Sequence, residues 1–151
     1  MRIGIVAESA VGETRVSATP STVRQLVKLG YDVVVQTDAG LPSSYPDVAY
    51  AASGGRIVDK NTAWGSDVVL SVNAPSDDEL SLLASGATLV SWLSPGLNPE
   101  MVEKLVALPI TALSVDTVPR ISRAQTMDVL SSTANIAGYR AVIEAANEFG
   151  R

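Results

Sequence analysis

Residues 2–6 read Arg-Ile-Gly-Ile-Val, and residues 32–36 read Asp-Val-Val-Val-Gln. Both are short apolar runs, and the second is dense in β-branched side chains, which is typical of strands buried on both faces of a sheet. Between them, residues 21–29 predict a helix, because Thr19 is a plausible N-cap and Pro20 suits the first turn. A strand, a helix and a second strand in this order predict a parallel pair joined by a right-handed crossover.

The same alternation continues along the chain. Further strands are predicted at residues 56–58, 67–72, 87–93 and 110–115, and further helices at residues 46–52, 77–83, 99–107 and 131–149. The sequence therefore predicts an α/β domain with an open, doubly wound, mostly parallel sheet, in a three-layer arrangement of the Rossmann-like or flavodoxin-like type. In such sheets ligands bind beyond the carboxyl ends of the strands, where the strand order reverses.

Composition excludes several classes of function. The 151 residues suffice for one domain, and 46% of them are hydrophobic, enough to bury a core. The net charge of −5 argues against a nucleic-acid partner, because such domains usually carry a basic face. The absence of cysteine and histidine excludes disulfides, thiolate chemistry and a Ser-His-Asp triad within this chain. We expect neither a signal peptide nor a membrane span, because the apolar runs are too short.

The long polar stretch at residues 116–132 is the first candidate site, since loops of this length between a strand and a helix are usually functional. Arg120 could clamp a phosphate or carboxylate, and Gln125 could bind an amide of a ligand. Asp128 could hold either of them in position, and Ser131 lies near a helix N-terminus. The alternative is a solvated loop in which Asp128 or Ser131 only caps the helix, and the spacing does not decide between the two.

The loop after the first strand, residues 8–16, is the second candidate, because it lies at the ligand edge of a parallel sheet. Arg15 could bind an anion there, although the residues alone favour an exposed arginine paired with Glu13. The chain has no glycine-rich G-x-G-x-x-G loop, so it carries no recognisable dinucleotide fingerprint of its own. The acidic run at residues 77–79 indicates a capped helix start rather than a metal site.

Several blocks of the sequence together resemble the alanine dehydrogenase/proton-translocating NAD(P) transhydrogenase superfamily. The longest reads Val-Pro-Arg-Ile-Ser-Arg-Ala-Gln at 118–125, followed by Met-Asp at 127–128 and Asn-Ile-Ala-Gly-Tyr-Arg-Ala-Val at 135–142. The other blocks are residues 1–5, 13–16, 18–20, 72–75 and 89–92. The longest block is similar to the transhydrogenase alpha subunit rather than to alanine dehydrogenase.

The resemblance implies an enzyme that transfers hydride between NAD(H) and NADP(H), coupled to proton translocation. Residues 1–128 would form the first domain of its NAD(H)-binding component, and residues 129–151 a long helix leading to a dinucleotide-binding domain that binds most of the NAD. By motif position, Arg120, Gln125, Asp128 and Ser131 would contact the nicotinamide end of NAD, with the first three as the catalytic set. This fragment alone would be inactive.

The resemblance also implies partners and a location. The partners would be the second domain of the same subunit, the beta subunit, the NADP(H)-binding component and a second copy of the subunit. The complex would hold this domain on the cytoplasmic side, peripheral to the inner or plasma membrane.

Two positions depart from the family pattern. Alanine dehydrogenases use a lysine and a histidine where this chain has Ser71 and Ser94, so only Arg15 of their amino-acid site is kept. Many transhydrogenases also keep the lysine. The alternatives are an amino-acid dehydrogenase of the same superfamily and a non-enzymatic interaction module.

Overall fold

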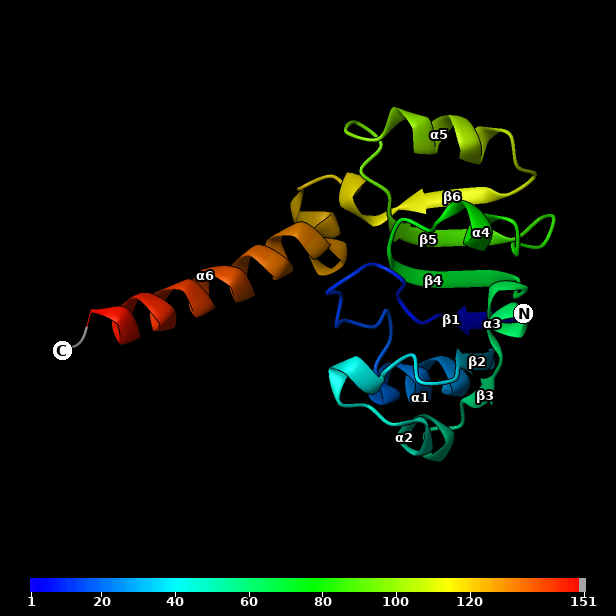
Figure 1. Cartoon of the computed structure of the whole chain (residues 1–151), viewed down its shortest axis with the longest axis horizontal. Helices are drawn as coiled ribbons and strands as arrows, with labels where there is room; N and C mark the ends of the chain where they lie inside the picture. The colour runs from blue at the N-terminus through cyan, green and yellow to red at the C-terminus, as the bar shows by residue number, and fades with distance from the viewer. Residues whose placement is uncertain (150–151) are drawn as a thin grey trace. The chain divides into compact units, whose positions relative to one another are not determined.

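The computed structural model describes residues 1–149, which divide into two units. The first unit, Met1–Ser114, contains a six-stranded sheet with helices on both faces (Figure 1). The second begins at Val115 and contains one long helix.

The sheet is parallel throughout. Its strands are β1 (Arg2–Ile5), β2 (Asp32–Gln36), β3 (Arg56–Val58), β4 (Val68–Asn73), β5 (Thr88–Trp92) and β6 (Thr111–Ser114). Their spatial order is β3-β2-β1-β4-β5-β6, and every neighbouring pair runs parallel. The predicted doubly wound sheet is confirmed, and the order is the Rossmann one rather than the flavodoxin-like one. The order reverses between β1 and β4, which makes their carboxyl ends the expected ligand edge.

The helices of the first unit are short. They are α1 (Pro20–Lys28), α2 (Asp47–Ala52), α3 (Lys60–Trp64), α4 (Asp77–Leu80) and α5 (Pro99–Val106), with a 3-10 turn η1 (Leu41–Ser43). The predicted helices are confirmed, but the one expected at 77–83 ends at Leu80. Helix α3 was not predicted, because five residues are too few to show a helical period. Its N-cap is Asp59, whose carboxylate accepts hydrogen bonds from the N–H and hydroxyl of Thr62.

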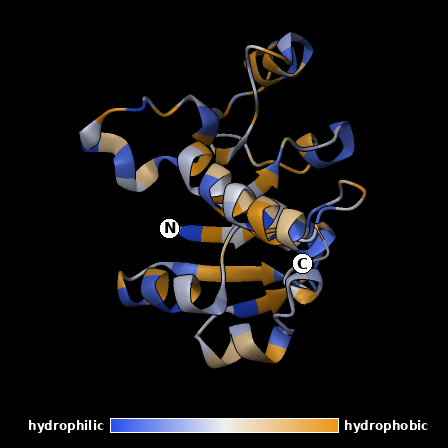
Figure 2. Ribbon diagram, turned by 90° about the vertical axis from the view of Figure 1, so that its left-hand side faces the viewer, coloured by the Kyte–Doolittle hydropathy of each residue, from blue (hydrophilic) through white to orange (hydrophobic). Residues whose placement is uncertain are grey.

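Two apolar clusters, one on each face, hold the sheet between its helices. The cluster that includes residues of α1 and α2 contains Ile5, Ala18, Val23, Val33, Val35, Ala39 and Tyr50. The cluster that includes residues of α3, α4 and α5 contains Val6, Ala63, Trp64, Val69, Leu80, Leu89, Leu93, Met101 and Leu105. Neighbours such as Ile5 and Val6 belong to opposite clusters, as the alternation of side chains along an extended segment requires. Figure 2 shows the resulting strands as largely hydrophobic ribbons.

In the second unit, two 3-10 turns, η2 (Val115–Thr117) and η3 (Ser122–Met127), precede helix α6 (Val129–Glu148). The helix starts at Val129, two residues before the start at Ser131 that the local pattern predicted, because Asp128 is its N-cap. Residues 150–151 of the range 129–151 implied by the resemblance lie outside the described residues. The predicted boundary between residues 128 and 129 thus falls at this cap, inside the second unit. No helix among residues 1–149 is long and apolar enough to cross a membrane.

Gly4 lies in the middle of β1 and close to the backbone of helix α3. A Cβ atom at this position would lie 2.1 Å from the backbone oxygen of Ala63 and 2.8 Å from Ser66 Oγ. Because the nearest obstacle is backbone, the strand and the helix would have to separate to admit a methyl group.

We therefore expect Gly4→Ala to lower the free energy of unfolding by about 3 kcal/mol, as overpacking against backbone does. Urea unfolding followed by circular dichroism measures this. The control is Gly138→Ala on α6, where, apart from its chain neighbours and the helix's own backbone, no described atom lies within 4 Å of the added Cβ. This control substitution should not lower the free energy of unfolding, since alanine has a higher helix propensity than glycine. Equal stability of Gly4→Ala and the parent would contradict the tight contact.

Candidate functional site

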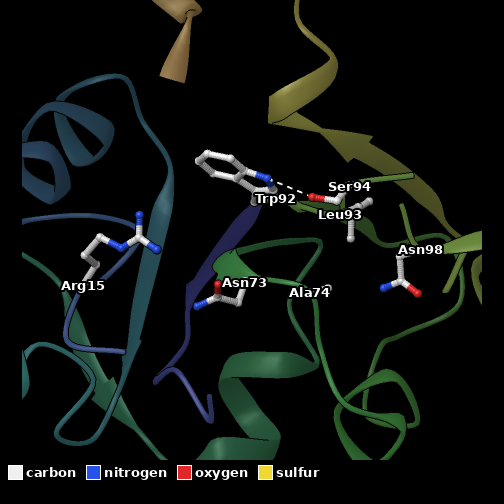
Figure 3. A pocket seen from close by; sticks show the side chains of 7 residues that line it. All are labelled: Arg15, Asn73, Ala74, Trp92, Leu93, Ser94 and Asn98. Atoms are coloured by element: carbon white, nitrogen blue, oxygen red, sulfur yellow. Dashed lines mark hydrogen bonds between the residues drawn. The ribbon is translucent and has the colours of Figure 1, made fainter. Parts of the chain in front are cut away.

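A pocket of about 390 Å³ lies at the carboxyl ends of the central strands. Its lining residues come from the last residues of β4 and β5 and from the loops after β1, β4 and β5, and all belong to the first unit (Figure 3). They are Arg15, Asn73, Ala74, Trp92, Leu93, Ser94 and Asn98. The pocket therefore occupies the point where the strand order reverses, as expected for a doubly wound sheet.

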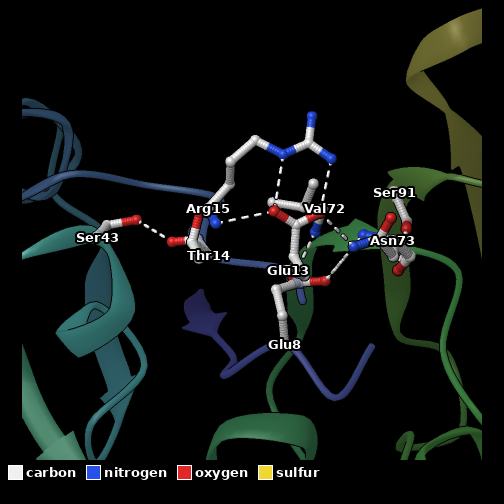
Figure 4. Close-up of polar contacts among 8 residues, drawn as sticks. All are labelled: Glu8, Glu13, Thr14, Arg15, Ser43, Val72, Asn73 and Ser91. Atoms are coloured by element: carbon white, nitrogen blue, oxygen red, sulfur yellow. Dashed lines mark hydrogen bonds and ion pairs between the residues drawn. The ribbon is translucent and has the colours of Figure 1, made fainter. Parts of the chain in front are cut away.

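Glu8 joins the loop after β1 to the end of β4. Its carboxylate accepts hydrogen bonds from the backbone N–H of Val72 at 2.6 Å, from the backbone N–H of Asn73 at 3.0 Å and from Asn73 Nδ2 at 3.1 Å (Figure 4). The register of β4 against β5 is irregular between Leu70 and Asn73, so regular strand pairing is interrupted there. Glu8 supplies acceptors for backbone donors at this irregularity.

Glu13 and Arg15 form a bidentate ion pair beside the pocket. The Glu13 carboxylate accepts from Arg15 Nε at 2.8 Å, from Arg15 Nη2 at 2.6 Å and from the Arg15 N–H at 2.8 Å, and also from Asn73 Nδ2 at 2.8 Å. The hydrogen bonds from Arg15 are the main reason that the pKa of Glu13 falls to about 2; partial burial opposes the shift and Asn73 adds to it. The same pair raises the pKa of Arg15.

The predicted pairing of Arg15 with Glu13 is thus confirmed, and it does not remove Arg15 from the pocket. The Glu13 side chain is 11% exposed, whereas 51% of the Arg15 side-chain surface remains exposed. The guanidinium is therefore fixed by a largely covered carboxylate while it still lines a ligand-sized space. This geometry suits a polar or anionic group.

In the same pocket, Trp92 Nε1 donates to Ser94 Oγ at 3.0 Å (Figure 3). Ser94 has a φ of 48°, in the left-handed region that non-glycine residues rarely adopt. The backbone N–H groups of Leu97 and Asn98 both donate to the Ser94 carbonyl at 2.9 Å and hold this conformation. Such local strain is concentrated at functional sites.

The four residues predicted from the resemblance lie in the second unit. Arg120, Gln125 and Ser131 are exposed, and Asp128 is buried. The Asp128 carboxylate accepts from the Ser131 N–H at 2.9 Å and from the Ser131 hydroxyl at 2.5 Å. These hydrogen bonds lower the pKa of Asp128, with a smaller contribution from the charge of Arg120. The structure thus brings Asp128 and Ser131 together as a helix cap, while contact of the four residues with a cofactor stays a prediction.

Comparison with known proteins identifies the family. The family described as "Alanine dehydrogenase/PNT, N-terminal domain" matches residues 4–137. The chain belongs to this family.

The relatives of this alanine dehydrogenase/PNT N-terminal domain include transhydrogenase alpha subunits and alanine dehydrogenases. The NAD(P) transhydrogenase subunit alpha of Haemophilus influenzae is 51% identical over 99% of this chain and 29% of its own length. An alanine dehydrogenase of Staphylococcus aureus is 32% identical over 97% of this chain and 38% of its own. A solved transhydrogenase from Sinorhizobium meliloti has a TM-score of 0.95 and 42% identity, covering 100% of this chain and 46% of that one. The chain therefore spans less than half the length of each.

Within this alanine dehydrogenase/PNT N-terminal domain, Ser71 and Ser94, which stand where alanine dehydrogenases have a lysine and a histidine, lie in different surroundings. Ser94 lines the pocket, whereas Ser71 is 9% exposed and lines a separate small cavity near the turn after β4. Neither serine titrates near neutral pH, so neither supplies the positive charge of lysine or the proton exchange of histidine.

Sequence reasoning missed Asn73, Trp92 and Asn98 as parts of this pocket. Asn73 and Trp92 are the last residues of β4 and β5, and Asn98 caps α5 by accepting from the Met101 N–H at 3.3 Å. The sequence did show that a polar and an aromatic residue lie at the ends of two predicted strands. Assigning them to one pocket required knowing that the two strands are neighbours, and the sequence alone did not provide the strand order.

The ion pair predicts a pH dependence with a definite sign. Because the pKa of Glu13 is lowered from 4.5 to about 2, its ionised form stabilises the fold above pH 4.5, and this is lost as the pH falls toward 2. At pH 7, Glu13→Gln should lower the free energy of unfolding by about 1 to 2 kcal/mol. The difference from the parent should shrink steadily below pH 4.5.

Urea unfolding between pH 7 and pH 3 measures this difference. Glu103→Gln, at an exposed position of α5, is the matched control and should stay within about 0.5 kcal/mol of the parent. A Glu13→Gln difference that is the same at every pH would show that the carboxylate is not held by Arg15 and Asn73.

Proposed function

We propose that this chain is the first domain of the NAD(H)-binding alpha subunit of a transhydrogenase, which transfers hydride between NAD(H) and NADP(H) and couples the transfer to proton translocation. The observation that carries the proposal is the match of essentially the whole chain to a transhydrogenase alpha subunit at a higher identity than to alanine dehydrogenase. The fold agrees, since a Rossmann-ordered sheet presents loops at one edge to a dinucleotide.

In this proposal the segment 120–131 approaches the nicotinamide end of NAD, which carries the hydride. The exposed carboxamide of Gln125 can both donate and accept, so it is complementary to the carboxamide of nicotinamide. The exposed guanidinium of Arg120 presents further donors to the cofactor. The Asp128–Ser131 hydrogen bonds fix the start of α6, so these two residues orient the segment.

The partners of this domain follow from the same assignment. A second domain of the same subunit would bind most of the dinucleotide, because this chain carries no glycine-rich fingerprint. Exposed apolar residues of α6, among them Ile136, Tyr139 and Val142, are suited to contact with that domain. The beta subunit, the NADP(H)-binding component and a second copy of the subunit complete the proposed complex, which would place this domain at the cytoplasmic membrane surface.

An amino-acid dehydrogenase is the second candidate, because Arg15 lines a pocket at the switch point. Ser71 and Ser94 argue against it, since neither provides the lysine or histidine chemistry of that reaction. Alanine-dependent formation of NADH by the longer protein, this chain plus the following domain, would favour this second candidate over the first.

The sharpest test replaces Gln125 in the whole subunit, assembled with its partner components. Gln125→Ala should slow hydride transfer at least about tenfold through loss of orientation at the nicotinamide. The dissociation constant for NADH should change by less than about threefold, since the other domain supplies most of the binding. Single-turnover kinetics and NADH fluorescence measure the two quantities.

The matched control is Gln25→Ala on the exposed face of α1, which should change neither quantity. Unchanged hydride transfer in Gln125→Ala would remove Gln125 from the catalytic set. A large loss of NADH affinity with unchanged transfer would assign it to binding alone.

A further inference from the structure

Two buried polar atoms in the first unit have no hydrogen-bond partner among the described residues. They are Trp64 Nε1 on helix α3 and Ser71 Oγ on strand β4. Trp64 is 1% exposed and Ser71 is 9% exposed. An unpaired buried donor or hydroxyl is costly, so each of these atoms calls for a partner.

Both residues line the same small cavity. Its volume is about 10 Å³, and its other lining residues include Glu8, Ser9 and Glu79. This volume is roughly that needed by a single water molecule.

The hydrogen-bonding groups and charges of the lining residues determine which kind of molecule fits this cavity. The indole N–H of Trp64 can only donate, so its partner must accept a hydrogen bond; a metal cation or an ammonium ion cannot. The carboxylates of Glu8 and Glu79 disfavour an anion. A neutral molecule that both donates and accepts satisfies the indole and the hydroxyl together.

We propose that this cavity is a binding site for one water molecule, which accepts a hydrogen bond from Trp64 Nε1 and is hydrogen-bonded to Ser71 Oγ. The water links helix α3 to the segment of β4 where the register is irregular. Asn73 and Ala74 line both this cavity and the larger pocket at the switch point. The bound water therefore supports, from the interior, the turn that presents Asn73 to the pocket.

A crystal structure of the chain at a resolution of about 1.5 Å tests the site directly. The expected result is one density peak within about 2.7 to 3.2 Å of both Trp64 Nε1 and Ser71 Oγ. A dry cavity, or a direct hydrogen bond between the two side chains, would overturn the proposal.

Stability measurements give an independent test, because a water-bound hydroxyl and an unpaired hydroxyl predict different effects of Ser71→Ala on the melting temperature. If the hydroxyl binds water, Ser71→Ala should lower the melting temperature by about 3 °C. If the hydroxyl were unpaired, its removal would leave the melting temperature unchanged or raise it. The double variant Ser71→Ala/Trp64→Phe should lower the melting temperature by less than the sum of the two single decreases, since both substitutions disturb the same water. Additive losses would contradict a shared water.

Discussion

The arrangement of this domain depends on which groups accept hydrogen bonds from the backbone N–H groups where the strand order reverses. At the carboxyl ends of β1 and β4 the chain leaves the sheet in opposite directions, and the register of β4 is irregular between Leu70 and Asn73. Buried donors at such a point need acceptors from outside the ladder. Glu8 provides them, by accepting from two successive backbone N–H groups and from Asn73 Nδ2. This contact ties the loop after β1 to the end of β4 and holds Asn73, which lines the pocket.

Asn73 connects Glu8 to the other residues of the site through hydrogen bonds. Its side chain donates to both Glu8 and Glu13, and its carbonyl accepts from Ser91 Oγ at 2.7 Å. Glu13 in turn holds Arg15 at the pocket. The result is a hydrogen-bonded, polar edge in which Arg15 is the charged residue that lines the pocket. Such an edge can position a ligand, and the proposed hydride transfer would need no acid or base from this domain.

The sequence was sufficient for the architecture because each strand is a compact β-branched or apolar run, and helices α1 and α5 begin with a side-chain cap followed by proline. It could not distinguish a Rossmann order from a flavodoxin-like order, since local patterns carry no information on which strands pair. The Glu13–Arg15 pair was visible because its members are two residues apart. The contacts of Asn73 with Glu8 and Glu13 span more than 50 residues and depend on register. The spacing left open whether Asp128 only caps the helix, and its hydrogen bonds with Ser131 confirm the cap. The cofactor role of segment 120–131 came from resemblance and stays a prediction.

We propose that segment 120–131 faces a nicotinamide ring held by a neighbouring domain. A crystal structure of the longer subunit with bound NADH measures this most directly. The account predicts the nicotinamide carboxamide within hydrogen-bonding distance of Gln125, with the guanidinium of Arg120 beside the cofactor. A structure in which this segment pointed into bulk solvent, remote from the dinucleotide, would contradict it.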